Sequence, residues 1–179
     1  MSLYLYLPGT RAVGVLRATT EPMSFPASLS APYHSVASLH EALLATAARS
    51  RGILAFEWLH SDDGSQVEGT SDEPAVQLAL LRTQSVQGTE PPPLRAVVLF
   101  GEHAREAITS EVALRFAALL AGEPSSGDAE LRQRAAALRR RVEFAMLPLV
   151  NVRGRELFER GDVRHQARRT PAELLGAAL

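Results

Sequence analysis

The stretch Arg95-Ala-Val-Val-Leu-Phe-Gly-Glu-His-Ala-Arg-Glu-Ala-Ile-Thr-Ser110 joins a short apolar run to a helical pattern. Val97 to Phe100 are apolar without a polar break, as expected for a strand buried on both faces. Gly101 ends the strand, and the apolar residues that follow recur at spacings of three and four, which predicts a helix. His103 and Glu106 lie at the corner between the two elements. An imidazole nitrogen and a carboxylate oxygen placed three residues apart on a helical turn could converge on one metal ion.

The composition restricts what such a site can be. The chain has 179 residues, of which 46% are hydrophobic, so one domain with a sizeable core is expected. The absence of cysteine excludes disulfides, thiolate zinc sites and thiol nucleophiles. A metal would therefore need histidine and carboxylate ligands, and the histidines are His34, His40, His60, His103 and His165. The formal net charge of -1 argues against a dedicated nucleic-acid surface.

The N-terminal residues predict neither export nor insertion into a membrane. Their apolar pieces are short and interrupted, and Arg11 and Arg17 follow the first piece instead of preceding it, unlike a signal peptide. No later run approaches the roughly 20 apolar residues of a membrane-spanning helix. A cytoplasmic location without a membrane partner is therefore expected.

The residues before the central stretch predict a lead-in and then three elements. Residues 1–32 are expected to be an irregular lead-in, although two short strands could flank the turn at Pro8. Ser38, with a glutamate three residues on, is expected to cap a helix that ends near Arg49. Residues 53–60 are typical of a strand, and the alternation within residues 75–86 favours another.

The residues after the central helix predict a further helix and strand. Asp128 is a suitable cap for a helix through Arg141, and residues 142–148 have the composition of a strand. Strand, helix and strand in this order form a βαβ-type unit. We therefore expect an α/β protein with a three-layer α/β/α architecture and a mixed, mostly parallel sheet. After Asn151 the sequence becomes strongly basic.

Spacing alone leaves two interpretations of His103 and Glu106. They could be two ligands of a catalytic zinc ion, which normally has three protein ligands and a fourth position for water. They could instead be a surface pair at a helix start, where Glu106 would interact favourably with the positive end of the helix dipole.

The sequence Gly101-Glu-His-Ala-Arg-Glu-Ala-Ile108 closely resembles the zinc-binding signature of the metallocarboxypeptidase family. Other stretches resemble the family in the same order. They are Tyr33-His-Ser-Val-Ala-Ser-Leu-His-Glu-Ala-Leu, like the opening tyrosine and helix; Leu147-Pro-Leu-Val-Asn-Val-Arg-Gly-Arg-Glu-Leu157, like the end of the next strand; and Arg168-Arg-Thr170, like an arginine-bearing run. The resemblance covers residues 33–170, the N-terminal part of a carboxypeptidase A-like catalytic domain, and leaves residues 171–179 as a divergent apolar tail.

The resemblance implies an α/β/α fold and zinc-dependent hydrolysis of the C-terminal bonds of peptides or proteins by a metal-activated water. His103 and Glu106 match the first two zinc ligands, and Arg105 matches an arginine that helps to bind substrate. Arg169 best matches the arginine that polarises the scissile carbonyl, with Arg168 as a second register. A guanidinium suits that role because it stays charged and donates several hydrogen bonds.

The sequence departs from the family pattern after Thr170. Pro171-Ala-Glu-Leu-Leu stands where the family has an Asp-x-Asn-Arg segment that holds the terminal carboxylate of the substrate. The family's third zinc ligand and its general-base glutamate lie further along than this sequence runs, and His165 falls where the family has no ligand. We therefore expect a sheet truncated in its C-terminal half, an incomplete and weak zinc site, and no activity for this chain as it stands. A partner could cover the exposed sheet edge.

Two further alternatives follow from the resemblance. The chain could be a non-catalytic remnant that serves as an interaction module. It could also resemble a related zinc amidohydrolase that acts on acylated amino acids and has a similar Gly-x-His-x-x-Glu opening. The Ala-Arg pair between His103 and Glu106 and the downstream Pro-Leu-Val-Asn run favour the peptidase.

Overall fold

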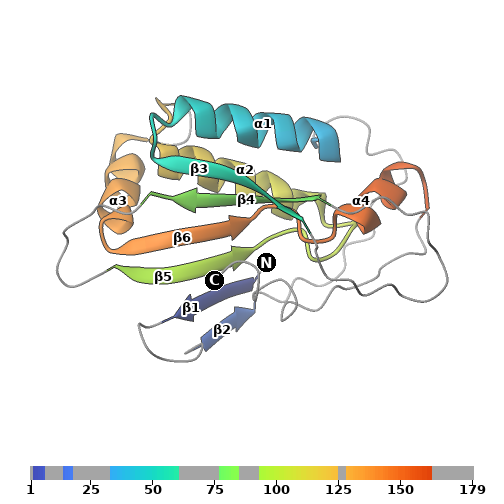
Figure 1. Cartoon of the computed structure of the whole chain (residues 1–179), viewed down its shortest axis with the longest axis horizontal. Coiled ribbons are helices and arrows are strands. Elements are labelled where there is room, and N and C mark those ends of the chain that lie inside the picture. Colours follow the sequence, from blue (N-terminus) through green and yellow to red (C-terminus); the bar gives the residue numbers. More distant parts are fainter. Residues whose placement is uncertain are drawn as a thin grey trace.

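The computed structural model describes residues 2–6, 14–17, 33–60, 77–84, 93–124 and 128–162, which form a sheet flanked by helices (Figure 1). The sheet has six strands in the order β2-β1-β5-β6-β4-β3. The strands are β1 (Ser2–Tyr6), β2 (Gly14–Arg17), β3 (Leu54–His60), β4 (Gln77–Thr83), β5 (Leu94–Leu99) and β6 (Val142–Leu147). The helices are α1 (Val36–Arg49), α2 (Ala107–Ala121), α3 (Ala129–Arg139) and α4 (Val152–Glu159). None of the described helices is long and apolar enough to cross a membrane.

The centre of the sheet confirms the predicted βαβ-type unit. Strands β5 and β6 are parallel neighbours, paired from Leu94 opposite Val142 to Leu99 opposite Leu147, and the chain between them passes through α2 and α3. The last four residues of each strand are buried, as expected for strands covered on both faces. Asp128 caps α3 as predicted, because its carboxylate accepts a 2.7 Å hydrogen bond from the amide of Leu131.

The sheet is mixed, but parallel pairs do not dominate it. Among the described strands, β5 and β6 are the parallel pair, and the other four pairings are antiparallel. The expectation of a mostly parallel sheet is therefore wrong. Strands β3 and β4 are consecutive in the chain and need no crossover to pair, so they lie antiparallel and extend the sheet on the β6 side.

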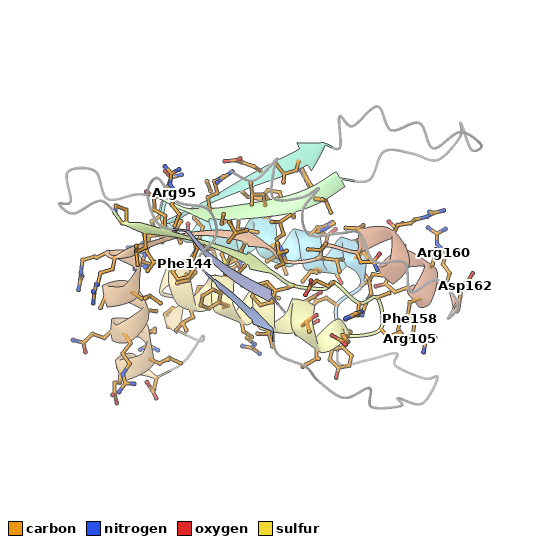
Figure 2. All side chains as sticks on the ribbon, turned by 90° about the horizontal axis from the view of Figure 1, so that it is seen from below. Arg95, Arg105, Phe144, Phe158, Arg160 and Asp162 are labelled. Atoms are coloured by element: carbon orange, nitrogen blue, oxygen red, sulfur yellow. The ribbon has the colours of Figure 1, made fainter. Side chains whose placement is uncertain are left out.

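The helices α1, α2 and α3 lie on the same side of the sheet (Figure 2), and α4 lies beyond the end of β6 (Figure 1). Within the described part of the chain, the three-layer arrangement is thus represented by the sheet and one helix layer. Helices α1 and α2 pack against each other in that layer.

The expected lead-in contributes to the sheet instead of being wholly irregular. Residues 2–6 and 14–17 form β1 and β2, and β1 pairs with β5 on the side opposite β6, with Leu3 opposite Val98. A buried strand needs hydrogen-bond partners along both edges, and β1 supplies them for β5. The boundary expected at residue 32 therefore does not separate these strands from the sheet.

Helix α1 begins three residues before the predicted position. Ser35 is the N-cap, and its side chain accepts a 3.2 Å hydrogen bond from the amide of Ser38, the residue expected to be the cap. Val36 is buried, so the first turn carries part of the apolar face and the helix includes it.

Helix α2 buries mostly small residues, together with Leu120 near its C-terminal end. Ala107, Ala113 and Ala117 are buried, whereas Ile108 and Val112, which belong to the predicted apolar stripe, are 51% and 45% exposed. The helix contacts both α1 and the sheet, and small side chains allow this close approach. Ile108 and Val112 lie on the exposed side of the helix, whereas Leu120 is fully buried.

His40, on α1, is a partly buried histidine whose buried Nε2 has no hydrogen-bond partner among the described residues. Its ring packs edge-on against Trp58 of β3, with 5.0 Å between ring centroids. Burial lowers the pKa of His40 below its ordinary value, and the negative charge of Glu156 opposes this only in part. The folded protein therefore keeps His40 neutral at pH values where the unfolded chain binds a proton. Its contribution to stability is present above about pH 6.5 and is lost as the pH falls toward the folded-state pKa.

We expect the variant His40→Phe, which keeps an aromatic ring against Trp58, to lose this pH dependence. As the pH is lowered from about 8 to about 5, the free energy of unfolding of the parent should fall more than that of the variant. Urea denaturation of both proteins across this pH range measures the free energy of unfolding of each. The other titrating groups are the same in both proteins, so their contribution cancels when one curve is subtracted from the other. A constant offset between the two curves would show that His40 does not titrate differently in the folded state.

Candidate metal centre

The candidate site lies where the parallel strands β5 and β6 end, the edge at which open α/β sheets usually bind ligands. Backbone pairing continues past both strands. The amide of Phe100 donates to the carbonyl of Leu147 at 2.9 Å, that of Val150 to Phe100 at 2.9 Å, and that of Asn151 to Gly101 at 3.0 Å. The loops before α2 and α4 are therefore joined to each other as well as to the sheet.

Gly101 is required where the first loop begins. Its φ is +62°, in the left-handed region, and a Cβ at this position would lie 2.5 Å from Leu149 Cδ1 and 3.0 Å from both Leu149 Cα and Ser110 Oγ. Real Cβ contacts are longer, so the second loop packs directly on the face of Gly101 that has no side chain.

Thr109 holds the two ends of the first loop together. Its hydroxyl accepts a 3.1 Å hydrogen bond from the amide of Gly101 and donates at 2.7 Å to the carbonyl of Glu106. The amide of Glu106 donates in turn to the carbonyl of His103 at 3.1 Å. The short segment with both candidate ligands is thus closed by three hydrogen bonds.

His103 and Glu106 occupy the strand-to-helix corner that the sequence predicts, and both are partly buried. Glu106 is the N-cap residue of α2, with φ -85° and ψ 60°, but its side chain makes no capping hydrogen bond. The helix start therefore does not use the carboxylate in the way that a capping glutamate would.

Arg105, between the two candidate ligands, is exposed. Figure 2 shows it at the same end of the molecule as Phe158, Arg160 and Asp162, which lie in and after α4. Arg169, the candidate for polarising a carbonyl, lies outside the described residues, as does its neighbour Arg168.

The donor set fits zinc in chemistry but not in number. An imidazole and a carboxylate are normal zinc ligands, and a catalytic site normally has three protein ligands. The described parts of the chain contain no group of three histidine, cysteine, aspartate or glutamate residues that could hold a metal ion. His34 bonds to Glu111 and His40 packs on Trp58, while the His60 side chain and His165 lie outside the described residues.

Asn151 is a part of the site that sequence reasoning identified only as the end of a strand. It is the N-cap of α4, a helix that was not predicted, and its Oδ1 accepts a 3.0 Å hydrogen bond from the amide of Gly154. Its Nδ2 donates to the carbonyl of Glu102 at 3.4 Å. An asparagine before residues with an Arg155–Glu159 helical spacing was the available signal.

A partly buried charge network connects α1, α2 and α4 beside the site. Arg155 donates from Nε to Glu159 at 2.9 Å and from Nη2 to the carbonyl of His34 at 3.1 Å. Glu159 also accepts from the amide of Val36 at 3.1 Å, and Glu111 of α2 accepts from the amide of His34 at 2.7 Å. The start of α1 is thereby tied to the two helices that follow the candidate loops.

Several solved structures resemble the chain. The structure of thrombin activatable fibrinolysis inhibitor matches with a TM-score of 0.55 and 20% identity, over 82% of this chain and 33% of that one, which shows a shared fold. A metallo-carboxypeptidase from Burkholderia cenocepacia has a TM-score of 0.46 and 22% identity, over 64% of this chain and 27% of that one. Bovine thrombin-activatable fibrinolysis inhibitor, solved in complex with tick carboxypeptidase inhibitor, matches with a TM-score of 0.47 and 17% identity. This match covers 78% of this chain and 37% of that one. The chain spans roughly a third of the length of these proteins.

A comparison with curated proteins gave no match. The sequence profile of the zinc carboxypeptidases, by contrast, matches residues 76–177, more than half of the 179 residues. The matched part contains β5, the loop with His103 and Glu106, the helices α2 and α3, β6 and the Asn151 loop. With the fold and the corner geometry in agreement, the chain belongs to the zinc carboxypeptidase family.

Proposed function

We propose that His103 and Glu106 are the first two zinc ligands of a metallocarboxypeptidase site that hydrolyses the C-terminal bonds of peptides or proteins. The observation that carries this proposal is the corner between β5 and α2. It brings an imidazole and a carboxylate onto one closed loop segment, and α2 makes no capping bond to the carboxylate.

Each residue of the proposed site has a distinct task. His103 and Glu106 would hold the zinc ion, which supplies a Lewis acid that makes water nucleophilic near neutral pH. Arg105, exposed beside them, would bind the substrate. Arg169 would stabilise the negative charge that develops on the scissile carbonyl oxygen, a role for which a permanently charged guanidinium is suited.

The proposal includes an incomplete site in the 179-residue chain. His103 and Glu106 would provide two ligands, catalytic zinc normally has three, and the described residues contain no group of three histidine, cysteine, aspartate or glutamate side chains that could hold a metal ion. The sequence resemblance assigns no residue of the sequence given to the family's third ligand, carboxylate anchors or general base, which supports this part of the proposal. Weak zinc binding and no hydrolysis are therefore proposed for this chain alone.

Zinc titration of the purified chain tests both parts of the proposal. We expect less than one equivalent of zinc to be retained at sub-micromolar free zinc, and no turnover of a blocked dipeptide, because two ligands hold the ion weakly. At higher zinc concentrations, the His103→Ala variant should bind less than the parent. His34→Ala, which removes a histidine bonded to Glu111, should bind zinc like the parent.

The outcomes separate the two parts. Stoichiometric zinc with chelator-sensitive hydrolysis would overturn the incomplete site. Equal weak zinc binding by the parent and by His103→Ala would overturn the ligand assignment.

One observation favours a non-catalytic interaction module as the second candidate. Ile108 and Val112 form an exposed apolar pair one turn apart on α2, directly after the proposed ligands. A partner that packs on this pair would need no zinc. Loss of its binding in Ile108→Ser, with His103→Ala unaffected, would support the second candidate over the first. The family match favours the peptidase over the related amidohydrolase.

A further inference from the structure

Three successive carbonyl groups of the first loop accept hydrogen bonds from two residues of the second. The carbonyls of Phe100 and Gly101 accept from the amides of Val150 and Asn151, at 2.9 and 3.0 Å. The third, that of Glu102, accepts from the Asn151 side chain at 3.4 Å. Because α4 begins directly after Asn151, the backbone turns away there, and the carboxamide provides the next bond.

The orientation of this carboxamide follows from its hydrogen bonds to Gly154 and Glu102. Gly154 presents an amide N–H, which needs an oxygen, and Glu102 presents a carbonyl, which needs an N–H. The reverse orientation would set donor against donor and acceptor against acceptor. Asn151 is 6% exposed, so neither contact would be readily replaced by water.

The carboxamide is also enclosed sterically. A Cβ on Gly154 would lie 2.5 Å from Asn151 Oδ1 and 2.7 Å from its Nδ2, so α4 leaves space for the amide only because residue 154 is a glycine. One side chain thus caps α4 and restrains the carbonyl of the residue directly before His103.

We infer that Asn151 is a positioning residue for the metal centre. It fixes the peptide between Glu102 and His103, and through it the direction in which the imidazole leaves the backbone. This inference rests on the proposed role of His103 as a ligand. Groups that orient ligands in this way typically change metal affinity by about 10- to 100-fold when they are removed.

Two variants separate the restraint from the helix cap. Asn151→Asp keeps an oxygen for the amide of Gly154 but replaces the donor toward Glu102 with an acceptor. Asn151→Ser is also a good N-cap, carries no charge, and is too short to span both contacts. Asp128→Ala, which removes the cap of α3 far along the chain, is the control for the loss of a cap alone.

The first measurement needs no metal. Amide hydrogen exchange at Gly101 and Glu106, whose N–H groups close the first loop, reports how often that loop opens. We expect exchange at both to be about tenfold faster in Asn151→Asp and Asn151→Ser, and unchanged in Asp128→Ala, while exchange at core amides of β6 stays the same in the two Asn151 variants.

The second measurement is titration with Zn²⁺, followed by NMR signals of the His103 ring. Both Asn151 variants should bind Zn²⁺ about tenfold more weakly than the parent. Unchanged exchange at Gly101 and Glu106, or unchanged or tighter Zn²⁺ binding in both variants, would overturn the positioning role. If exchange changes as expected but Zn²⁺ does not affect the His103 ring even in the parent, the restraint stands and the ligand assignment fails.

Discussion

The variant Gly101→Ala is expected to lower the free energy of unfolding by about 3 kcal/mol. A left-handed backbone conformation costs a non-glycine residue about 1–2 kcal/mol. The new methyl group would also overlap Leu149 and Ser110, and overpacking of this kind costs about 1–3 kcal/mol. Urea denaturation with a two-state analysis measures the sum.

Gly52→Ala is the matched control, because it separates the two causes. Gly52 also has a positive φ, +82°, but a Cβ there would meet no heavy atom within 4 Å. The free energy of unfolding of Gly52→Ala should therefore fall only by the cost of the left-handed backbone conformation, about 1 kcal/mol. Equal losses in the two variants would show that Leu149 and Ser110 can move aside and that the loops are not in firm contact.

The elements around this glycine could be predicted because their signals are local. The run from Val97 to Phe100 has no polar break, Gly101 interrupts it, and Asp128 precedes a helical pattern. Each feature acts within a few residues of itself. Strand β5, the corner with His103 and Glu106, helix α3 and strand β6 were accordingly placed to within a few residues.

The buried face of α2 could not be predicted in the same way. The helical spacing is shared by its large apolar residues and by its alanines, and hydrophobicity alone favours Ile108 and Val112 for the core. The structure selects Ala113 and Ala117 because α2 must approach both α1 and the sheet closely. That choice depends on neighbours distant in sequence, as does the antiparallel position of β4 beside β6.

The candidate ligands were predicted, but the groups that hold their loop were not. Thr109 and Asn151 act on backbone carbonyls and amides, which carry no sequence signal of their own. The bond from Asn151 joins residues 49 apart in the chain. Arg155 appeared in the sequence as one arginine in a basic segment, although it is 8% exposed in the structure.

The variant Arg155→Met is expected to lower the free energy of unfolding by about 2–3 kcal/mol, because it removes one partner of a largely buried ion pair. Methionine keeps most of the aliphatic volume, so the loss is mainly that of charge and hydrogen bonds. Among the described residues, the carboxylate of Glu159 would keep the amide of Val36 as a donor, and the carbonyl of His34 would lose the Arg155 guanidinium. The expected loss is below the upper range for buried pairs because the Glu159 side chain is 28% exposed.

Arg134→Met on α3 is the matched control. Arg134 pairs with Glu130 at the same i, i+4 spacing, but both side chains are at least 70% exposed, so a loss below about 0.5 kcal/mol is expected. Added salt should reduce the Arg134 effect and leave the Arg155 effect largely unchanged, since screening acts mainly on solvated charges. In the double variant Arg155→Met/Glu159→Gln part of the stability should return, because the stranded carboxylate is gone. Equal losses in the free energy of unfolding for Arg155→Met and Arg134→Met would mean that burial does not strengthen the Arg155–Glu159 ion pair. The charge network would then not hold the start of α1 against α4.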